Sequence, residues 1–210
     1  MRVLALDTTL EACQAAVLAG GRLLASRSEP MRRGHQERLA PMVAEVMQEA
    51  GLKLAALDRV GVATGPGSFT GLRVGLAFAK GLALARGIPC VGVGALEALA
   101  ASVEDPGVVA AVIDARRDQV YLQAFEAGQA LSEPEALFLE EAAERLRGLQ
   151  AGLLVGSGAP LLAEALPLVR AAGPVALDPA VLARLAARAP EPTTSPRPLY
   201  LRAPDARLPA

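Results

Sequence analysis

The pattern of apolar and polar positions divides the chain into two successive sets of strands and helices. In the first set, short apolar or alternating runs between turn residues predict strands. They lie at residues 2–6, 13–18, 22–29, 60–63 and 87–93. Apolar positions that recur every three or four residues predict helices over residues 36–50, 69–85 and 94–101. Charge, proline and glycine then gather at residues 103–107, which indicates a joint between two lobes.

The second set repeats this order. Strands are expected at residues 108–113, 119–126, 129–138 and 153–156, and helices at 139–149, 161–168 and 179–189. Both sets begin strand–strand–strand–helix, and an aspartate closes the first strand of each, Asp7 and Asp114. The order predicts an α/β fold of two duplicated ribonuclease-H-like lobes. The first covers residues 1–103, and the second covers 104–210 and ends in an irregular, proline-rich tail.

A glycine-rich stretch, residues 64–83, joins the predicted strand at 60–63 to the helix that follows it. Pro66 and its glycine neighbours predict a tight turn, with Ser68 as the N-cap of the helix. The stretch lacks the Gly-Lys-Ser/Thr ending of a P-loop and is one residue too long for the dinucleotide fingerprint. Glycine costs about 1 kcal/mol in a helix interior, so Gly71 and Gly75 require either a closely packed backbone or a bound anion.

Two of three further features allow two interpretations each. Asp7 and Thr8 could hold a metal-bound phosphate or satisfy turn amides. The apolar stripe of the helix at 36–50 could pack on the sheet or, with its two methionines, bind a partner helix. His35 is the only histidine, so it cannot build a two-histidine metal site, and a surface or capping role is expected.

Composition narrows the classes of function. The chain of 210 residues has a net charge of −1, which gives no electrostatic footprint for nucleic acid. The two cysteines, Cys13 and Cys90, lie in separate apolar segments, as is typical of buried thiols in a reducing compartment. No apolar run reaches the length of a membrane span. A cytoplasmic protein without membrane contact is therefore expected.

Several motifs resemble the TsaB (YeaZ) family of the ASKHA superfamily, which also contains actin-like ATPases and sugar kinases. The motifs are Leu4-Ala-Leu-Asp-Thr-Thr9, Gly34-His-Gln-Glu-Arg-Leu-Ala-Pro41, Ala63-Thr-Gly-Pro-Gly-Ser-Phe-Thr-Gly-Leu-Arg73, Val112-Ile-Asp-Ala-Arg116 and Pro198-Leu-Tyr-Leu-Arg202. The resemblance is strong over residues 1 to about 125. It implies the two-lobed ASKHA fold.

The resemblance also implies a function in making threonylcarbamoyladenosine beside the anticodon of tRNAs. In this family the chain is a non-catalytic scaffold that binds and activates a TsaD-like catalytic subunit, joins a larger complex with a TsaE-like ATPase, and forms a homodimer when alone. The contact uses the first two helices, which places these residues at the interface: Leu39, Met42, Val43, Val46, Leu72, Gly75 and Leu76. Contact with tRNA is expected to be indirect, because of the near-neutral charge.

The same resemblance indicates that catalytic groups are missing. Ala95 and Leu99 stand where TsaD has its metal-binding histidines, and only Glu97 remains, so no metal and no catalytic residue are expected. Ala115-Arg116-Arg117 replaces the glycines that admit phosphates after the second aspartate in working ASKHA ATPases. Asp7, Thr8 and Asp114 would then form a vestigial nucleotide site. Weak binding of a nucleotide by this chain is therefore not excluded. ATP is expected to be used by the complex, and no cofactor is expected in this chain. The alternative is an ASKHA-type ATPase or small-molecule kinase that acts alone.

Overall fold

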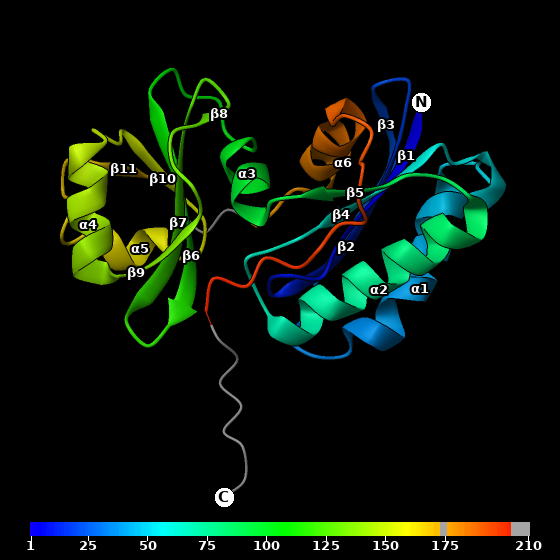
Figure 1. The fold of residues 1–210 in the computed structure, drawn as a ribbon, viewed down its shortest axis with the longest axis horizontal. Coiled ribbons are helices and arrows are strands. Elements are labelled where there is room, and N and C mark those ends of the chain that lie inside the picture. Colours follow the sequence, from blue (N-terminus) through cyan, green and yellow to red (C-terminus); the bar gives the residue numbers. More distant parts are fainter. Residues whose placement is uncertain (173–175, 203–210) are drawn as a thin grey trace, which may run out of the picture.

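The computed structural model describes residues 1–172 and 176–202, which form two lobes (Figure 1). The first lobe is built on a five-stranded sheet with the order β3-β2-β1-β4-β5. Its strands are β1 (Arg2–Asp7), β2 (Ala12–Ala19), β3 (Arg22–Pro30), β4 (Arg59–Ala63) and β5 (Cys90–Val93). β1, β2 and β3 pair antiparallel, whereas β1, β4 and β5 pair parallel. The carboxyl ends of β1 and β4 therefore meet at one edge of the sheet.

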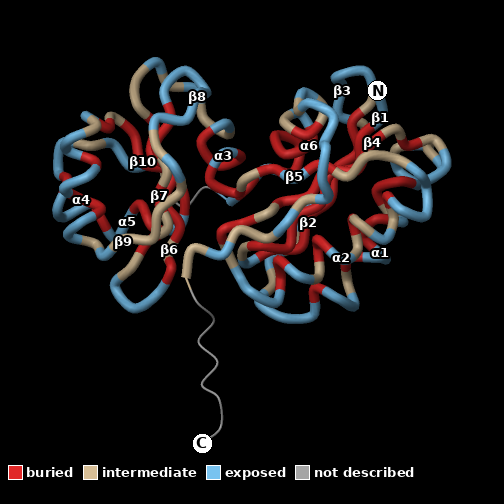
Figure 2. The backbone as a smooth tube through the Cα atoms, viewed as in Figure 1, coloured by how far each residue is buried: buried red, intermediate tan, exposed pale blue. Residues whose placement is uncertain are grey.

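Both faces of this sheet are covered, which explains why β1 is apolar along almost its whole length. α1 (His35–Glu49) and α2 (Phe69–Arg86) lie side by side on one face, where Leu4 and Leu6 point. A short 3₁₀ turn, η1 (Leu54–Ala56), follows α1. Val3 and Ala5 point to the opposite face, which α6 (Pro179–Arg188) covers. Figure 2 shows the buried backbone running through the middle of the lobe.

The second lobe is built on a six-stranded sheet with the order β11-β10-β6-β7-β8, in which β9 also pairs with β7. Its strands are β6 (Val108–Arg116), β7 (Gln119–Glu126), β8 (Gln129–Ala130), β9 (Glu135–Phe138), β10 (Leu153–Val155) and β11 (Arg170–Ala171). α4 (Leu139–Gly148) and α5 (Ala159–Leu162) cover one face, and α3 (Ala95–Ala100) packs on the other. Val112 faces α4 and α5, while Ala111 and Ile113 face α3, so β6 is also buried on both sides.

Two helices do not pack in the lobe that their position in the sequence suggests. The sequence pattern places α6 with residues 104–210, but α6 packs on β1, β2 and β4 of the first sheet. The Arg59 guanidinium donates hydrogen bonds to the carbonyls of Ala186 and Ala189, which fixes the end of α6 on β4. Conversely, α3 precedes residue 103 and packs on β6 and β7. Amphipathic spacing predicts a helix but does not identify the sheet that covers it.

Most predicted elements are present within a few residues of the expected bounds. The exceptions lie in the second lobe. The strand expected at 129–138 is two short strands, β8 and β9, and the helix expected at 161–168 is the single turn α5. β11 is an unpredicted strand of only two residues. The α/β two-lobed architecture predicted from the order of elements is confirmed.

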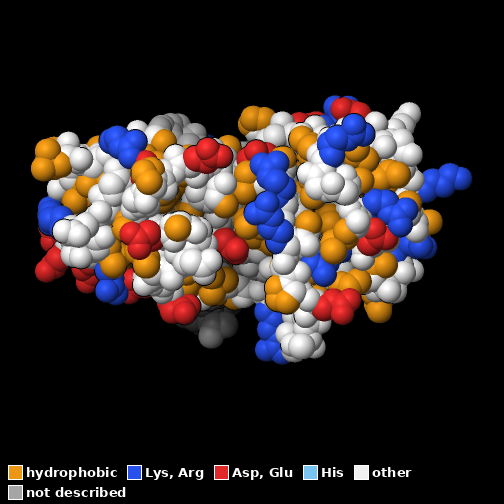
Figure 3. Space-filling model, turned by 90° about the horizontal axis from the view of Figure 1, so that it is seen from above, with side chains coloured by type: hydrophobic (Ala, Val, Ile, Leu, Met, Phe, Trp, Pro, Cys, Tyr) orange, Lys and Arg blue, Asp and Glu red, His pale blue; other side chains and the backbone are white. Residues whose placement is uncertain are grey.

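Within the described part of the chain, no helix is both long enough and apolar enough to span a membrane. On the face seen in Figure 3, acidic and basic side chains are interspersed over both lobes.

Candidate functional site

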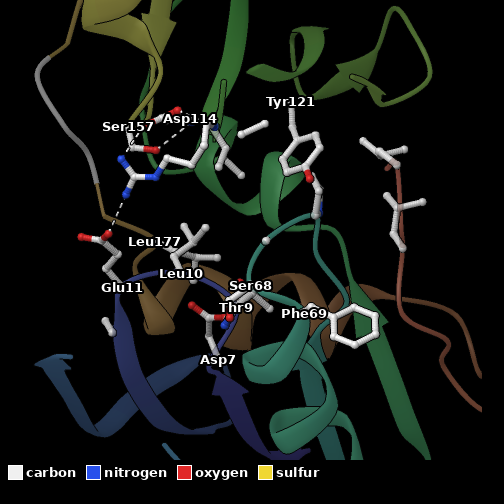
Figure 4. Close-up of a pocket in the computed structure, with 18 of the residues that line it drawn as sticks. Asp7, Thr9, Leu10, Glu11, Ser68, Phe69, Asp114, Tyr121, Ser157 and Leu177 are labelled. Carbon is white, nitrogen blue, oxygen red and sulfur yellow. Dashed lines mark hydrogen bonds and ion pairs between the residues drawn. The ribbon is translucent and has the colours of Figure 1, made fainter. Parts of the chain in front are cut away.

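A cavity of about 770 Å³ lies between the two lobes (Figure 4). The first lobe lines it with the end of β1, the β1–β2 loop and the start of α2. The second lobe contributes residues of β6 and β7, and residues 199–202 of the C-terminal segment form a further wall. Asp7 and Asp114, which the sequence places at the ends of corresponding strands, both line this cavity.

Asp7 is buried and has one engaged and one unengaged carboxylate oxygen. Its Oδ1 accepts hydrogen bonds from the Thr9 amide at 2.7 Å and from the Thr9 hydroxyl at 2.6 Å. Its Oδ2 has no hydrogen-bond partner among the described residues. Burial raises the pKa of Asp7, while the Thr9 hydrogen bonds and the charge of His35 act in the opposite direction. The engaged oxygen agrees with the interpretation in which Asp7 satisfies turn amides.

The glycine-rich turn is filled by the chain's own backbone. A Cβ atom on Gly71 would lie 1.9 Å from the Thr8 carbonyl oxygen, and one on Gly67 would lie 2.2 Å from that of Thr9. Thr8 is buried and donates its hydroxyl to the Gly71 carbonyl at 2.7 Å. Of the two interpretations of these glycines, close packing is therefore the one that the structure supports.

Several amides at this turn are also engaged. The Ser68 amide donates to the Thr9 carbonyl at 2.7 Å, and the Gly71 amide donates to the Ser68 hydroxyl at 3.3 Å, so Ser68 is the expected N-cap. The Leu72 amide donates to the Ser68 carbonyl. An anion that used the Ser68 or Gly71 amide would have to displace these partners, although helix N-termini commonly bind phosphate.

The second aspartate is tied to an arginine that bridges the lobes. The Asp114 carboxylate accepts from the Arg116 amide at 2.7 Å and from its guanidinium at 2.9 Å. The same guanidinium donates to Glu11 of the first lobe at 3.0 Å, so it lies between Glu11 and Asp114 (Figure 4). Arg116 and Arg117 both have positive φ in the β6–β7 turn. The Arg116 side chain thus occupies the space after the second aspartate, where the family resemblance implies that phosphates have little room.

The residues predicted at a partner interface lie elsewhere than expected. Leu39, Met42, Val43, Val46, Leu72, Gly75 and Leu76 are all buried inside the first lobe. Most of them belong to the core between α1, α2 and the sheet. A Cβ atom on Gly75 would lie 2.6 Å from the Thr8 hydroxyl, so this glycine is needed within the chain. The placement of these residues at a partner surface is wrong in this structure. Helical spacing predicts that a side chain is buried, but it does not reveal whether its own sheet or a partner protein buries it.

Sequence reasoning also missed part of the site. Tyr121 and Tyr200 line the cavity. The C-terminal segment that carries Tyr200 was expected to be irregular, and the sequence did not predict where it lies. The only signal was the family-like motif at residues 198–202. His35 is buried rather than exposed, and its Nε2 has no hydrogen-bond partner among the described residues. No set of three or more His, Cys, Asp or Glu side chains in residues 1–172 and 176–202 is arranged to hold a metal ion.

Comparisons with known proteins give matches along most of the chain. The family model described as "TsaD: tRNA N6-adenosine threonylcarbamoyltransferase" matches residues 25–143. The Escherichia coli K12 protein named tRNA threonylcarbamoyladenosine biosynthesis protein TsaB is 39% identical over 124 residues, which are 58% of this chain and 53% of that protein. The match thus spans about half the length of that curated relative. An uncharacterized Mycobacterium tuberculosis H37Rv protein is 38% identical over 98% of this chain and 93% of its own length.

Solved structures extend these matches. A Pseudomonas aeruginosa protein described as similar to peptidase YEAZ is 33% identical, with a TM-score of 0.84 over 96% of this chain and 99% of its own. The ROK hexokinase of Thermus thermophilus is 17% identical, with a TM-score of 0.52 over 89% and 98%, and shares the fold alone. Two α/β lobes that enclose a cleft with an aspartate from each give this chain the fold of the actin-like ATPase (ASKHA) class. Within this class, the chain carries the TsaD family domain and belongs to the TsaB (YeaZ) family.

Proposed function

We propose that this chain is a non-catalytic subunit in the biosynthesis of threonylcarbamoyladenosine on tRNA, and that it binds and activates a TsaD-like catalytic subunit. The process is supported by the relatives named TsaB and by the TsaD family domain. The scaffold role is supported by one surface, formed by the outward sides of α1 and α2. On this proposal the chain is cytoplasmic and pairs with itself when alone, and a TsaE-like ATPase joins the larger complex. ATP is used by the complex, and this chain carries no cofactor.

The outward sides of α1 and α2 carry small, exposed residues. These are Ala40, Pro41 and Ala44 on α1 and Ala77, Gly81 and Ala85 on α2. Leu84 of α2 is 85% exposed. The two helices lie next to each other on the outer face of the first sheet (Figure 1). Small side chains let a further pair of helices approach to the 8–10 Å typical of helix packing. We define this surface as the α1–α2 face; it replaces the buried residues predicted from the sequence.

The cleft supports the non-catalytic part of the proposal. The Ser68 and Gly71 amides at the start of α2 are engaged, and burial favours the neutral form of Asp7. The Arg116 guanidinium pairs with Asp114. Phosphoryl transfer relies on positioned donors and a metal-holding carboxylate around the phosphates. A polyphosphate in this cleft would compete with the chain's own contacts.

One observation favours the alternative, an ATPase or small-molecule kinase that acts alone. Asp7 and Asp114, from corresponding strands of the two lobes, face one cavity, as expected for a phosphate-binding cleft. Thr8, the remaining member of the predicted vestigial site, is buried against Gly71 instead. Release of phosphate from ATP by the purified chain, lost in Asp7→Asn, would favour this alternative.

The test is the mass in solution of the chain mixed with the TsaD-like protein of the same host, measured by light scattering. We expect a one-to-one complex that Ala77→Arg weakens, because the exposed alanine can accept arginine in the free chain but not under a partner helix. Ala163→Arg, at an exposed position after α5 in the second lobe, is the matched control. Failure of the unaltered chain to bind would overturn the scaffold proposal. Normal binding by Ala77→Arg would show that another surface is used.

A further inference from the structure

Aromatic side chains are scarce in this chain but concentrated at the interlobe cavity. The sequence contains four phenylalanines, two tyrosines and no tryptophan. Both tyrosines, Tyr121 and Tyr200, line the cavity together with Phe69. Phe69 starts α2, Tyr121 lies on β7, and Tyr200 belongs to the C-terminal segment, so the rings come from three separate parts of the fold. Figure 4 shows Tyr121 and Phe69 on opposite sides of the cavity.

Phe69 and Tyr200 form a fixed aromatic pair. Their ring centroids are 5.1 Å apart and their planes are tilted by 38°. The Arg73 guanidinium lies 3.7 Å from the centre of the Phe69 ring, and its Nε donates to the Tyr200 hydroxyl at 3.2 Å. Nevertheless, Phe69 remains 36% exposed and Tyr200 42% exposed. These rings therefore offer apolar faces to a ligand without first having to be ordered.

The backbone around Tyr200 is held by both lobes. The Leu199 amide donates to the Thr64 carbonyl at 2.8 Å in the first lobe. The Arg202 guanidinium donates to the Ala115 carbonyl at 2.9 Å in the second lobe. The wall that carries Tyr200 is thus anchored on either side of the ring.

Cations accompany these rings. Arg32, Arg116 and Arg202 line the cavity, and Arg73 borders it through Phe69. The acidic side chains there are Glu11 and Asp114, which pair with arginine, and Asp7, whose pKa burial raises. Three arginines and three carboxylates therefore line the cavity, and Arg73 at its border adds a further cation. The Ser68 and Gly71 amides, which could otherwise hold phosphate oxygens at the start of α2, are engaged within the chain, which favours a ligand with a ring and a single phosphate over a nucleoside triphosphate.

We propose that the cavity binds one unpaired nucleotide of an RNA loop. Its base stacks on the Phe69–Tyr200 pair, and its phosphate contacts the surrounding arginines. Unpaired bases in RNA are recognised by stacking on aromatic rings and guanidinium planes, and 770 Å³ is within the range of small-ligand sites. The inference rests on the proposed function in tRNA modification. It changes the expectation of indirect tRNA contact, because stacking on the aromatic pair and contacts with individual arginines do not depend on the average charge.

The test is binding of a fluorescent RNA hairpin with an unpaired loop to the full chain, followed by anisotropy. A fully paired duplex of the same composition is the RNA control. Phe69→Leu and Tyr200→Leu keep apolar volume but remove the rings, and each should weaken loop binding at least fivefold, about the lower limit for one stacked base. Phe138→Leu, at a phenylalanine that is 53% exposed and not among those lining the cavity, should leave binding unchanged. Arg73→Gln should reduce the slope of log affinity against log salt by about 1, whereas the exposed Arg22→Gln should not.

Competition by free AMP and ATP distinguishes the source of the nucleotide. Strong binding of AMP that depends on Phe69, without binding of the loop, would overturn the RNA proposal in favour of a free nucleotide. Equal binding of loop and duplex, or binding that Phe69→Leu and Tyr200→Leu leave unchanged, would overturn the cavity as the site. The measurements are repeated in the presence of the TsaD-like protein, whose binding is followed separately by light scattering. If the RNA loop does not bind although the complex with the TsaD-like protein forms, this inference is refuted and the proposed function is not.

Discussion

Substitution of Gly71 by alanine should destabilise the protein, although alanine is the better helix former. Gly71 lies in the first turn of α2 with an ordinary helical φ, so the new side chain meets no backbone strain of its own. Its Cβ atom, however, would lie 1.9 Å from the Thr8 carbonyl oxygen and 3.0 Å from the carbonyl carbon. Both are backbone atoms of the β1–β2 loop. The helix would therefore have to move away from this loop.

The magnitude follows from opposing contributions. Replacing glycine by alanine in a helix contributes about 1 kcal/mol of stability. Overpacking against backbone costs about 1–3 kcal/mol, and loss of the buried hydrogen bond from the Thr8 hydroxyl to the Gly71 carbonyl costs about 1 kcal/mol more. We expect a net loss of about 2 kcal/mol. At about 2–4 °C per kcal/mol for a chain of this size, the Tm should fall by about 4–8 °C.

Gly81→Ala in the same helix is the matched control. No heavy atom lies within 4 Å of the Cβ position at Gly81, so only the gain in helix propensity remains. This variant should be more stable than the parent by about 0.5–1 kcal/mol. Both variants would be measured by urea and thermal unfolding followed by circular dichroism. A Gly71→Ala protein as stable as the parent would refute the close contact between α2 and the β1–β2 loop.

The remaining predictions concern buried polar and thiol groups. Asp7→Asn keeps an oxygen for Thr9 but removes the buried acid, whose pKa burial raises above its ordinary value. Between the unfolded and folded pKa values the native parent binds more protons than its unfolded chain, so parent stability falls as pH rises. The asparagine variant should therefore gain stability relative to the parent from about pH 4 to pH 7, and a difference independent of pH in urea unfolding would contradict this. Arg59→Leu should cost about 2 kcal/mol, measured by urea unfolding, because two carbonyls at the end of α6 lose their donor; unchanged stability would count against this anchoring role. Burial, complete for Cys13 and partial for Cys90, raises the pKa of both thiols to about 11. Both should therefore react slowly with a disulfide reagent at about pH 8 until urea unfolds the chain, and a rapid reaction of the native protein would contradict this effect of burial.

The sequence predicts most elements of this fold because burial leaves a periodic record. β1 is apolar on both faces because helices cover both sides of its sheet, and α1 carries an apolar stripe because one side faces the core. Elements of two to four residues, such as β8, β11 and α5, are too short to leave such a record. Their positions depend on contacts with neighbouring strands.

The candidate site was predicted less completely. Asp7 and Asp114 could be paired from the repeated order of elements, and both line the cavity. The apolar stripe of α1 could not reveal whether Val46 faces its own sheet or another protein, because either environment selects the same side chains. Tyr200 could not be placed, because no periodic pattern in residues 190–202 locates it beside Phe69.

The return of α6 to the first sheet has a consequence for synthesis of the chain on the ribosome. Residues 108–171 contain every strand of the second sheet, so that sheet can pair as soon as these residues have emerged. The first sheet has its last strand at Val93, but one of its faces stays uncovered until residues 179–188 arrive. Domains usually complete in the order of their synthesis. Here the lobe that is translated first should be the last to close, and a nascent chain stopped near residue 172 should expose the apolar surface that α6 later covers.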